Sequence, residues 1–333
     1  METEAQAAAQ RNRAPNGYHR GCAHWVIEPG VLEPHAPEAA RLELMNLRAF
    51  AAAPDRLEHF LEPVARIDDC ILENATASEP LFFGHVNVSD EFNFLMRTGD
   101  VLMDHGRGRT FFFHPETGAL IGYTLAGAGD VVLHPQGLVH WPGQLKDPFT
   151  PVPQGDERRK LFTIVYCSYT RQRDNESARP PERRVVQWPQ AQGPFLPQFE
   201  GYPLQQGVVK VNTHAERFGV TSVLALGAAV DRKSHALTTL GRVANTQVDF
   251  FTAEGPRGAP FGNPDGLYLI CYEGAARVEI TDGTRSVATL RARTADMIKI
   301  PAGWDFETHV EEGYPARSLF LVFRRSPRAG AAA

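Results

Sequence analysis

From about residue 68 onward, the chain alternates short apolar runs with turn residues. The runs are rich in Val, Ile, Phe, Tyr and Thr, and Gly, Pro and Asp separate them. Typical examples are EPLFFGHVNV and LFTIVYCSY in the first half, and DGLYLICYEG and SLFLVFRR in the second half. Short strands between closely spaced turns are typical of antiparallel sandwiches and barrels. The pattern predicts a mainly all-β protein with two β-rich units.

The same pattern sets the expected domain boundaries. The segment 173–207 is rich in proline and charge, which disfavours a central strand and favours a connector on the surface. The two ends carry Ala, Arg, Gly and Pro without a hydrophobic period, so we expect them to be disordered. The expected order is a disordered N-terminus (1–17), a first barrel (18–172), the connector (173–207), a second barrel (208–326) and a disordered tail (327–333).

Two helices are expected before the first strand. The segments 37–50 and 54–67 each begin at a proline and carry apolar residues at roughly i, i+3 and i+4. A proline at the first turn followed by that spacing is typical of an amphipathic helix. We therefore predict a few N-terminal helices beside the β units.

Composition and charge narrow the class of protein. The formal charge is −5 over 333 residues, and no Lys/Arg run marks a nucleic-acid-binding surface. The four cysteines form no CxxC pair, which favours a reducing compartment. No apolar stretch is long enough for a membrane span or a signal peptide. We therefore expect a cytoplasmic protein that binds neither nucleic acid nor membrane.

The candidate metal-binding residues lie in two segments, GHVNVSDEFNFLMRTGD (84–100) and GDVVLHPQGLVHWPG (129–143). If 85–95 is a strand, then His85, Asn87 and Glu91 project from one face. Such a polar face inside a barrel is explained by a metal, because ligation offsets the desolvation of buried His and Glu.

His140 is expected to join this face from the strand beyond the turn PQG. Two imidazoles and one carboxylate form the facial arrangement that suits non-haem Fe(II) and dioxygen. The predicted metal ligands are therefore His85, Glu91 and His140. Asn87 is either an additional oxygen ligand or a residue that hydrogen-bonds to a ligand.

The stretch HVNVSDEF resembles the metal motif of homogentisate 1,2-dioxygenases, and LHPQGLVHWPG resembles the second motif of that family. The resemblance implies a cupin protein with Fe(II) at His85, Glu91 and His140, and a pocket histidine at His134. The metal motif comes first here, as in single-chain 3-hydroxyanthranilate dioxygenases, which are bicupins with a degenerate second barrel. The spacing also resembles hydroquinone dioxygenases. The implied fold is a bicupin of two double-stranded β-helix (jelly-roll) barrels, and the substrate stays open.

Other residues are candidates for the substrate pocket. His134 is either the base that accepts the phenol proton, since a neutral imidazole is a good base near neutral pH, or a strand-end histidine that caps the turn at Pro135. Arg97, Arg107 and Arg109 are candidates for binding a substrate carboxylate, with Arg97 preferred. A stripe of phenylalanines forms either a pocket wall or simply barrel core; its members are Phe92, Phe94, Phe111, Phe112 and Phe113.

The second barrel lacks an equivalent ligand set. Phe261, Asn263, Leu267 and Phe306 fall where ligands are expected, so we predict that this interior is filled by apolar core. His309 is a weak ligand candidate, and a surface or structural position is the alternative.

These features together predict an Fe(II)-dependent dioxygenase that opens the ring of a small hydroxylated aromatic compound with O2. Other metal-dependent cupin enzymes, such as isomerases, thiol dioxygenases and decarboxylases, stay open, as does a non-catalytic cupin that binds a small ligand. A homodimer is expected, because exposed sheet edges need covering.

Overall fold

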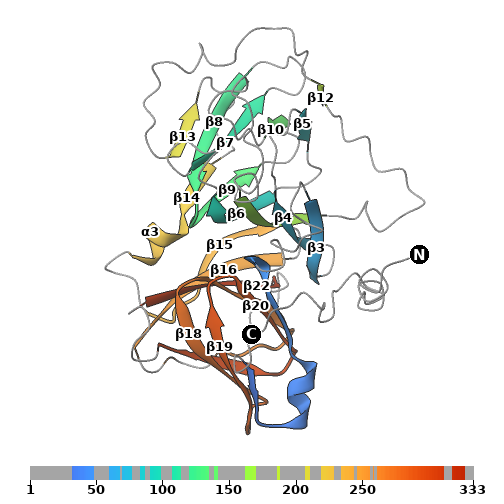
Figure 1. Ribbon diagram of the computed structural model, residues 1–333, viewed down its shortest axis with the longest axis vertical. Helices are drawn as coiled ribbons and strands as arrows, with labels where there is room; N and C mark the ends of the chain where they lie inside the picture. Colours follow the sequence, from blue (N-terminus) through green and yellow to red (C-terminus); the bar gives the residue numbers. More distant parts are fainter. Residues whose placement is uncertain are drawn as a thin grey trace, which may run out of the picture. The chain divides into compact units, whose positions relative to one another are not determined.

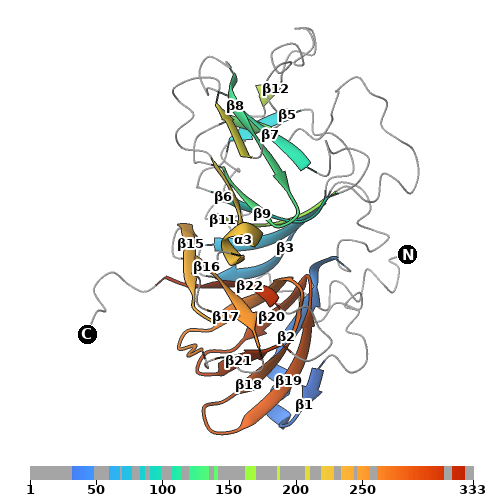
Figure 2. The same ribbon diagram turned by 90° about the vertical axis from the view of Figure 1, so that its left-hand side faces the viewer.

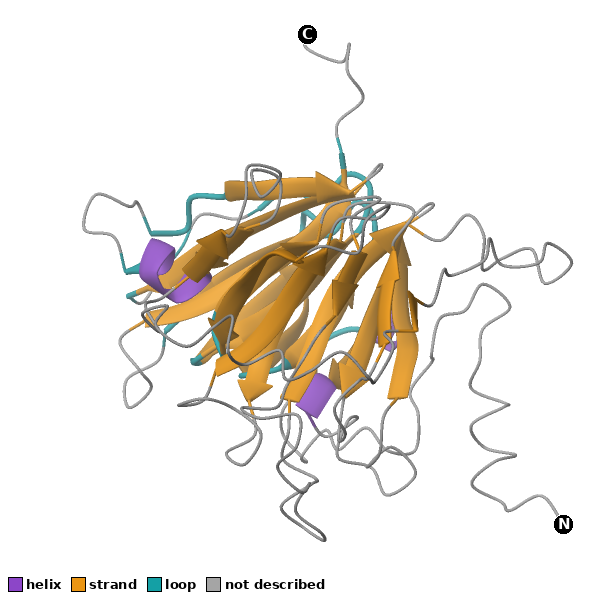
Figure 3. Ribbon diagram, turned by 90° about the horizontal axis from the view of Figure 1, so that it is seen from above, coloured by secondary structure: helices purple, strands orange, loops and turns teal. Residues whose placement is uncertain are grey.

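The computed structural model describes the β-rich parts of the chain. The described residues are 32–48, 60–67, 70–76, 83–86, 91–98, 107–113, 120–134, 139–141, 162–169, 186–187, 207–210, 219–228, 234–243, 246–255, 258, 261–310 and 317–326. Strands account for nearly all of the described elements (Figure 3). The prediction of a mainly all-β fold is confirmed.

The chain divides into two compact units. Unit 1 contains residues Met1–Ala53, Pro63–Cys70 and Val223–Ala333, and unit 2 contains Pro54–Glu62 and Ile71–Ser222. Each unit is built on antiparallel strand pairs, which leave alternate side chains for an interior face.

Unit 1 has two sheets, of order β1-β19-β18-β21 and β15-β16-β22-β17-β20-β2. Figure 2 shows β1 beside β19 in this unit. The helical residues described in this unit include the short 3-10 helix η1 (Pro37–Arg41), Leu47 and Arg48, and α3 (Val223–Gly227). Its strands are β1 (Leu32–Pro34), β2 (Glu43–Asn46), β15 (Thr238–Val243), β16 (Thr246–Glu254), β17 (Leu267–Glu273), β18 (Ala275–Thr281), β19 (Ser286–Arg293), β20 (Asp296–Ile300), β21 (Asp305–His309) and β22 (Arg317–Arg325).

The remaining strands form two six-stranded sheets, of order β12-β5-β10-β7-β8-β13 and β14-β9-β6-β11-β4-β3 (Figure 1). These strands are β3 (Phe60–Ile67), β4 (Cys70–Thr76), β5 (Phe83–Val86), β6 (Glu91–Thr98), β7 (Arg107–Phe113), β8 (Leu120–Gly127), β9 (Asp130–His134), β10 (Val139–Trp141), β11 (Phe162–Tyr169), β12 (Val186–Gln187), β13 (Gly207–Lys210) and β14 (Gly219–Ser222).

Of the two helices expected from periodicity, the first is interrupted by a strand, and the second is wrong over its described part. In the first segment, Pro37–Arg41 is a 3-10 helix and Leu47 and Arg48 are helical, but Glu43–Asn46 between them pairs with β20 as an edge strand. In the second segment, Phe60–Ile67 is a strand at the edge of its sheet. Pro63 explains this outcome, because a proline inside a helix costs about 3 kcal/mol whereas an edge strand tolerates it.

The strands near the expected start of the second barrel belong to unit 2. The strand Gly207–Lys210 pairs with β8, and Gly219–Ser222 pairs with β9. Conversely, the early strands β1 and β2 pair with β19 and β20 of unit 1. The division between the units therefore differs from the expected boundary at residue 208, because backbone pairing joins segments distant in sequence.

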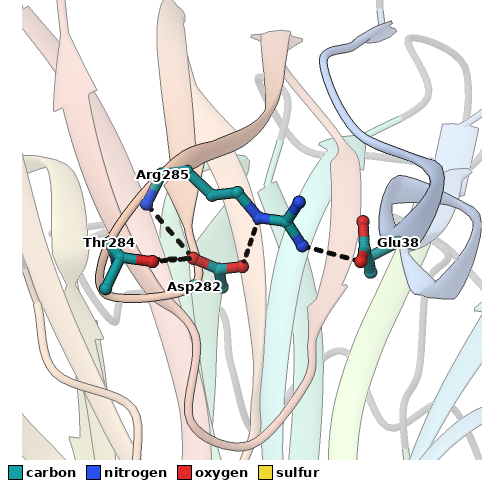
Figure 4. Close-up of polar contacts among 4 residues, drawn as sticks. All are labelled: Glu38, Asp282, Thr284 and Arg285. Carbon is teal, nitrogen blue, oxygen red and sulfur yellow. Dashed lines mark hydrogen bonds and ion pairs between the residues drawn. The ribbon is translucent and has the colours of Figure 1, made fainter.

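An ion-pair cluster ties η1 to the turn between β18 and β19 (Figure 4). Arg285 donates from Nε to Asp282 Oδ2 at 2.8 Å and from Nη2 to Glu38 Oε1 at 2.6 Å. The hydrogen bond from the Arg285 side chain is the main cause that lowers the pKa of Asp282 to about 2. Thr284 also donates to Asp282, which closes the turn.

Of the two cysteines whose side chains are described, one differs from the expectation of reduced thiols and one agrees with it. Cys70 is fully buried and disulfide-bonded to a cysteine whose side chain is not among those described. Cys271 is a free thiol, and burial raises its pKa well above the usual value. Sequence separation was a poor guide to disulfide bonding, because strand pairing brings distant residues together.

No helix in the described part of the chain is long and apolar enough to cross a membrane.

Candidate metal centre

Three potential ligands converge inside unit 2. Glu91, His134 and His140 each offer one ligand atom, and these atoms all lie within 4.8 Å of one another. The residues are buried, with exposed fractions of 6%, 3% and 1%. Within the described ranges, this is the one group of three or more His, Cys, Asp or Glu residues with such spacing.

The strand register explains why these residues meet. Glu91 begins β6 and lies directly opposite His134, the last residue of β9. Directly opposite residues of an antiparallel pair project from the same face. His140 lies in β10, which belongs to the other sheet of the unit. The candidate centre therefore draws its donors from both sheets.

A tight turn sets the course of β9. Gly129 has a φ of 93°, a backbone conformation that glycine adopts at little cost. Its N–H donates to Leu95 O at 2.8 Å, and Asp130 Oδ2 accepts from the N–H of Gly127 at 2.9 Å. The sequence GDVVLH thus begins β9 at a position that brings its last residue, His134, opposite Glu91.

A fourth polar side chain, that of Asn93, joins the centre. It is 4% exposed and lies two residues after Glu91, on the same face of β6. Asn93 Nδ2 donates to Glu91 Oε1 at 2.7 Å and lies 2.8 Å from His134 Nδ1. Sequence reasoning missed Asn93, although its odd-numbered position on the same strand was an available signal.

An aromatic side chain packs against the two imidazoles. Phe112 is fully buried in β7, opposite His140. Its ring centroid lies 5.6 Å from that of His134, in an edge-on arrangement, and 6.3 Å from that of His140. The two imidazole centroids are 4.3 Å apart. Phe112 therefore restricts how both rings can turn and shields them from water.

The donor set fits a divalent metal. A buried carboxylate beside two buried imidazoles is costly unless each group is paired or ligated. The nearest pair, His134 Nδ1 and Glu91 Oε1, is 3.1 Å apart. Mixed imidazole and carboxylate donors suit Fe(II) and Mn(II), whereas structural zinc favours sulfur-rich sites.

For the other predicted ligands, the structure describes the backbone at most. The backbone of His85 lies in β5 and pairs with that of His140, while its side chain lies outside the described residues. Asn87 also falls outside them. The predicted pocket histidine, His134, lies beside Glu91 and His140 as a potential ligand.

For the candidate substrate-binding arginines, the structure likewise describes the backbone and not the side chains. Arg97 lies in β6 opposite Thr163, and Arg107 and Arg109 lie in β7, with side chains outside the described set. Of the phenylalanine stripe, Phe112 contacts the site. Phe92 and Phe94 have the opposite parity to Glu91 on β6, so they face away from it. The side chains of Phe111 and Phe113 are not described.

In unit 1, apolar side chains fill the corresponding interior. Phe306 and Leu267 belong to the buried core, and Phe261 stacks on Phe306 with centroids 5.0 Å apart. Asn263 donates to the carbonyls of Ile300 and Pro301, which makes it a turn-stabilising residue.

His309 belongs to no group of three or more potential metal ligands among the described residues. Its Nε2 lies 3.6 Å from Glu279 Oε2 and 3.8 Å from Glu307 Oε1, at the ends of partly exposed side chains. These distances fit a structural histidine between surface carboxylates.

Comparison with known proteins identifies the fold. No protein-family model and no curated protein matches the chain. A cupin 2 conserved barrel domain protein from Leptotrichia buccalis is similar with a TM-score of 0.51 at 7% identity, over 85% of this chain and 96% of that one.

Two further solved structures have lower scores. Oxalate decarboxylase from Bacillus subtilis, with Mn(II) centres, has a TM-score of 0.44 at 10% identity, over 86% of this chain and 72% of that one. Salicylate 1,2-dioxygenase from Pseudoaminobacter salicylatoxidans has a TM-score of 0.46 at 11% identity, over 77% and 68%. The antiparallel strand order and the Leptotrichia likeness together show that this chain has the cupin fold.

Proposed function

We propose that this protein is a metal-dependent enzyme that opens the ring of a hydroxylated aromatic compound with dioxygen, using Fe(II). The observation that carries the proposal is the convergence of Glu91, His134 and His140 in a buried position within unit 2. A carboxylate and imidazoles in such a place favour a redox-active divalent metal with positions left for substrate and dioxygen.

Glu91 and His140 are the proposed core of the ligand set. The third ligand is either His134, which the geometry favours, or His85, which the resemblance implies. If His85 ligates, then His134 is free to act as the general base that accepts the phenol proton. Phe112 fixes the imidazole planes in either case.

Bound Fe(II) would supply a Lewis acid with adjacent open positions for a phenolate oxygen and for dioxygen. The residues of the chain supply orientation and a dry setting, which strengthens electrostatic interactions with the substrate. Arg97 is the proposed partner of a substrate carboxylate, because a guanidinium binds carboxylates bidentately. The proposed substrates are compounds such as homogentisate, gentisate, hydroquinone and 3-hydroxyanthranilate.

Metal content and oxygen uptake test the proposal directly. Purified protein is loaded anaerobically with Fe(II), freed of excess metal, and assayed for iron and for oxygen consumption with the four aromatic compounds. We expect about one iron per chain, since one mixed His and Glu donor set is present in the described residues. Absence of bound metal after loading would contradict the proposal.

Two single variants separate the possible ligand sets. If His134 is a ligand, His134→Ala loses Fe(II) binding and His85→Ala retains it. If His134 is the base, His134→Ala retains Fe(II) but loses turnover, and His85→Ala loses the metal. His309→Ala in unit 1 is the matched control, because it removes an imidazole that lies between surface carboxylates.

The other functions become outcomes of the same experiment. Metal binding without oxygen uptake would favour an isomerase or a decarboxylase of the same fold, and uptake with thiols would favour a thiol dioxygenase. A small molecule that binds without turnover, and equally well in Glu91→Ala, would favour a non-catalytic binding cupin. We also propose a cytoplasmic homodimer, which size-exclusion chromatography with light scattering and cell fractionation would test.

A further inference from the structure

The amide of Asn93 lies between the carboxylate of Glu91 and the imidazole of His134. Its Nδ2 donates to Glu91 Oε1 at 2.7 Å and lies 2.8 Å from Nδ1 and 3.3 Å from Nε2 of His134. Because both ring nitrogens are this close, the amide lies over the face of the imidazole and not in its plane. A ring nitrogen binds a metal in the plane of the ring, so Asn93 leaves both nitrogens accessible to a metal.

Strand pairing and burial hold the amide and the carboxylate together. Asn93 and Glu91 lie two residues apart on the same face of β6, and they are 4% and 6% exposed. Directly opposite them on β9 are Val132 and His134, which are also buried. Water therefore has little access to replace the amide N–H as the partner of the carboxylate.

The two oxygens of Glu91 differ in their surroundings. A carboxylate binds a metal either through one oxygen or through both. Asn93 Nδ2 and His134 Nδ1 lie 2.7 and 3.1 Å from Glu91 Oε1. Chelation through both oxygens would bring the metal to Oε1 as well, beside an amide that already donates to that oxygen. The hydrogen bond therefore favours metal binding through Oε2 alone.

We propose that Asn93 is a positioning residue that holds Glu91 Oε1, so that Glu91 binds the metal through Oε2 alone and a coordination position stays open. This inference rests on the proposed function, and it applies whether the third ligand is His134 or His85. A Glu91 that chelated through both oxygens would take a position otherwise open to the substrate oxygen or to dioxygen. Partners that hydrogen-bond to ligands are known to tune metal sites in this way.

Infrared spectroscopy of protein labelled with 13C-glutamate tests the proposal. The probe is Mn(II) alone, and the difference between loaded and metal-free full-length protein isolates the glutamate that binds it. A carboxylate bound through one oxygen has widely separated asymmetric and symmetric stretching bands, and chelation narrows the separation. We expect a wide separation in the wild type and a narrower one in Asn93→Leu, which keeps the size of the side chain but lacks the N–H.

Two further variants keep the experiment decisive. Asn74→Leu is the matched control, because Asn74 is a fully buried asparagine in β4, two strands from β6 in the same sheet. We expect it to retain the wide band separation of the wild type. If Asn93→Leu does not fold, as judged by circular dichroism, Asn93→Asp replaces it. That variant keeps the shape of the amide and lacks the N–H, and its own carboxylate carries no 13C label.

The water bound to Mn(II) gives a second readout that a merely structural role of Asn93 would not change. Line broadening of the Mn(II) EPR signal in 17O-enriched water should show one fewer exchangeable water in Asn93→Leu than in the wild type. Equal band separation and equal water in both proteins would overturn the inference. A wild type that takes up oxygen while Glu91 chelates would overturn it too, and would leave the proposed function standing. If the wild type binds no Mn(II) or Fe(II) at all, the proposed function fails as well.

Discussion

The interiors of the two units are related by their strand register. In unit 2, His85 pairs with His140 and Glu91 pairs with His134. In unit 1, Phe261 pairs with Phe306 and Leu267 pairs with Ile300. The order of these residues along the chain is also the same in each unit. The same backbone positions therefore carry candidate metal ligands in one unit and apolar side chains in the other.

The comparison extends to the neighbours of these pairs. Asn93 follows Glu91 by two residues, and Leu269 follows Leu267 by two. Phe112 pairs with His140 in unit 2, whereas Ile280 pairs with Phe306 in unit 1. The cupin fold thus supplies the positions, and the side chains decide whether an interior stabilises the protein or binds a ligand.

The largest expected effect is on the apolar interior. Phe306→Ala should lower the free energy of unfolding by about 3–5 kcal/mol, because it opens a cavity in a close-packed core. Urea denaturation followed by tryptophan fluorescence measures this loss. Metal affinity at unit 2 should stay unchanged in the folded protein. A loss below about 1 kcal/mol would mean that the core collapses around the missing ring.

A somewhat smaller effect is expected at the polar interior when metal is added. Excess Mn(II) at 100 times its dissociation constant should stabilise the folded protein by about 2.7 kcal/mol, because the metal binds the folded state. Thermal unfolding with Mn(II) and with a chelator measures the difference. Glu91→Gln should abolish it, since the variant lacks the charged oxygen donor. Equal stabilisation of this variant would place the metal elsewhere.

Unit 1 also contains a buried acidic side chain, Asp249, among its apolar residues. Asp249 is fully buried and accepts hydrogen bonds from Thr239 Oγ1, Gln247 Nε2 and Arg324 Nε, at 2.7, 2.8 and 2.7 Å. Asp249→Asn keeps the shape but loses the charge, and we expect a loss of about 2 kcal/mol because hydrogen bonds to charged groups are stronger. Arg324 is one-third exposed, so water limits the cost. Chemical denaturation of variant and wild type checks the value.

The smallest effect is expected at the exposed cluster of Glu38, Asp282 and Arg285. The pKa of Asp282 is about 2 in the folded protein, against 3.8 ordinarily. The carboxylate therefore contributes stability above about pH 4, and this contribution is lost as pH falls through 2. The stability difference between wild type and Asp282→Asn should shrink over that window, as measured by denaturation at several pH values. A difference independent of pH would contradict this assignment.

Sequence patterns predicted which segments form strands better than they predicted which strands pair. The alternation of apolar runs and turns predicted strands that the structure contains, and Phe306 and Leu267 lie in a core as their apolar character indicates. Periodicity failed at Glu43–Asn46 and Phe60–Ile67, where strand pairing replaced the expected helices. Helical spacing is a weak signal in short segments, and edge positions in a sheet override it.

The sequence by itself determined the class of fold and the chemical character of each interior, because strand texture and motif residues are local properties. Only the tertiary structure decided which groups converge. His134 lies 43 residues from Glu91, and Asn93 contacts both. It also decided that Gly207–Lys210 and Gly219–Ser222 pair with β8 and β9. The physical reason is that backbone hydrogen bonds join the strands, and these bonds are the same for every residue type except proline.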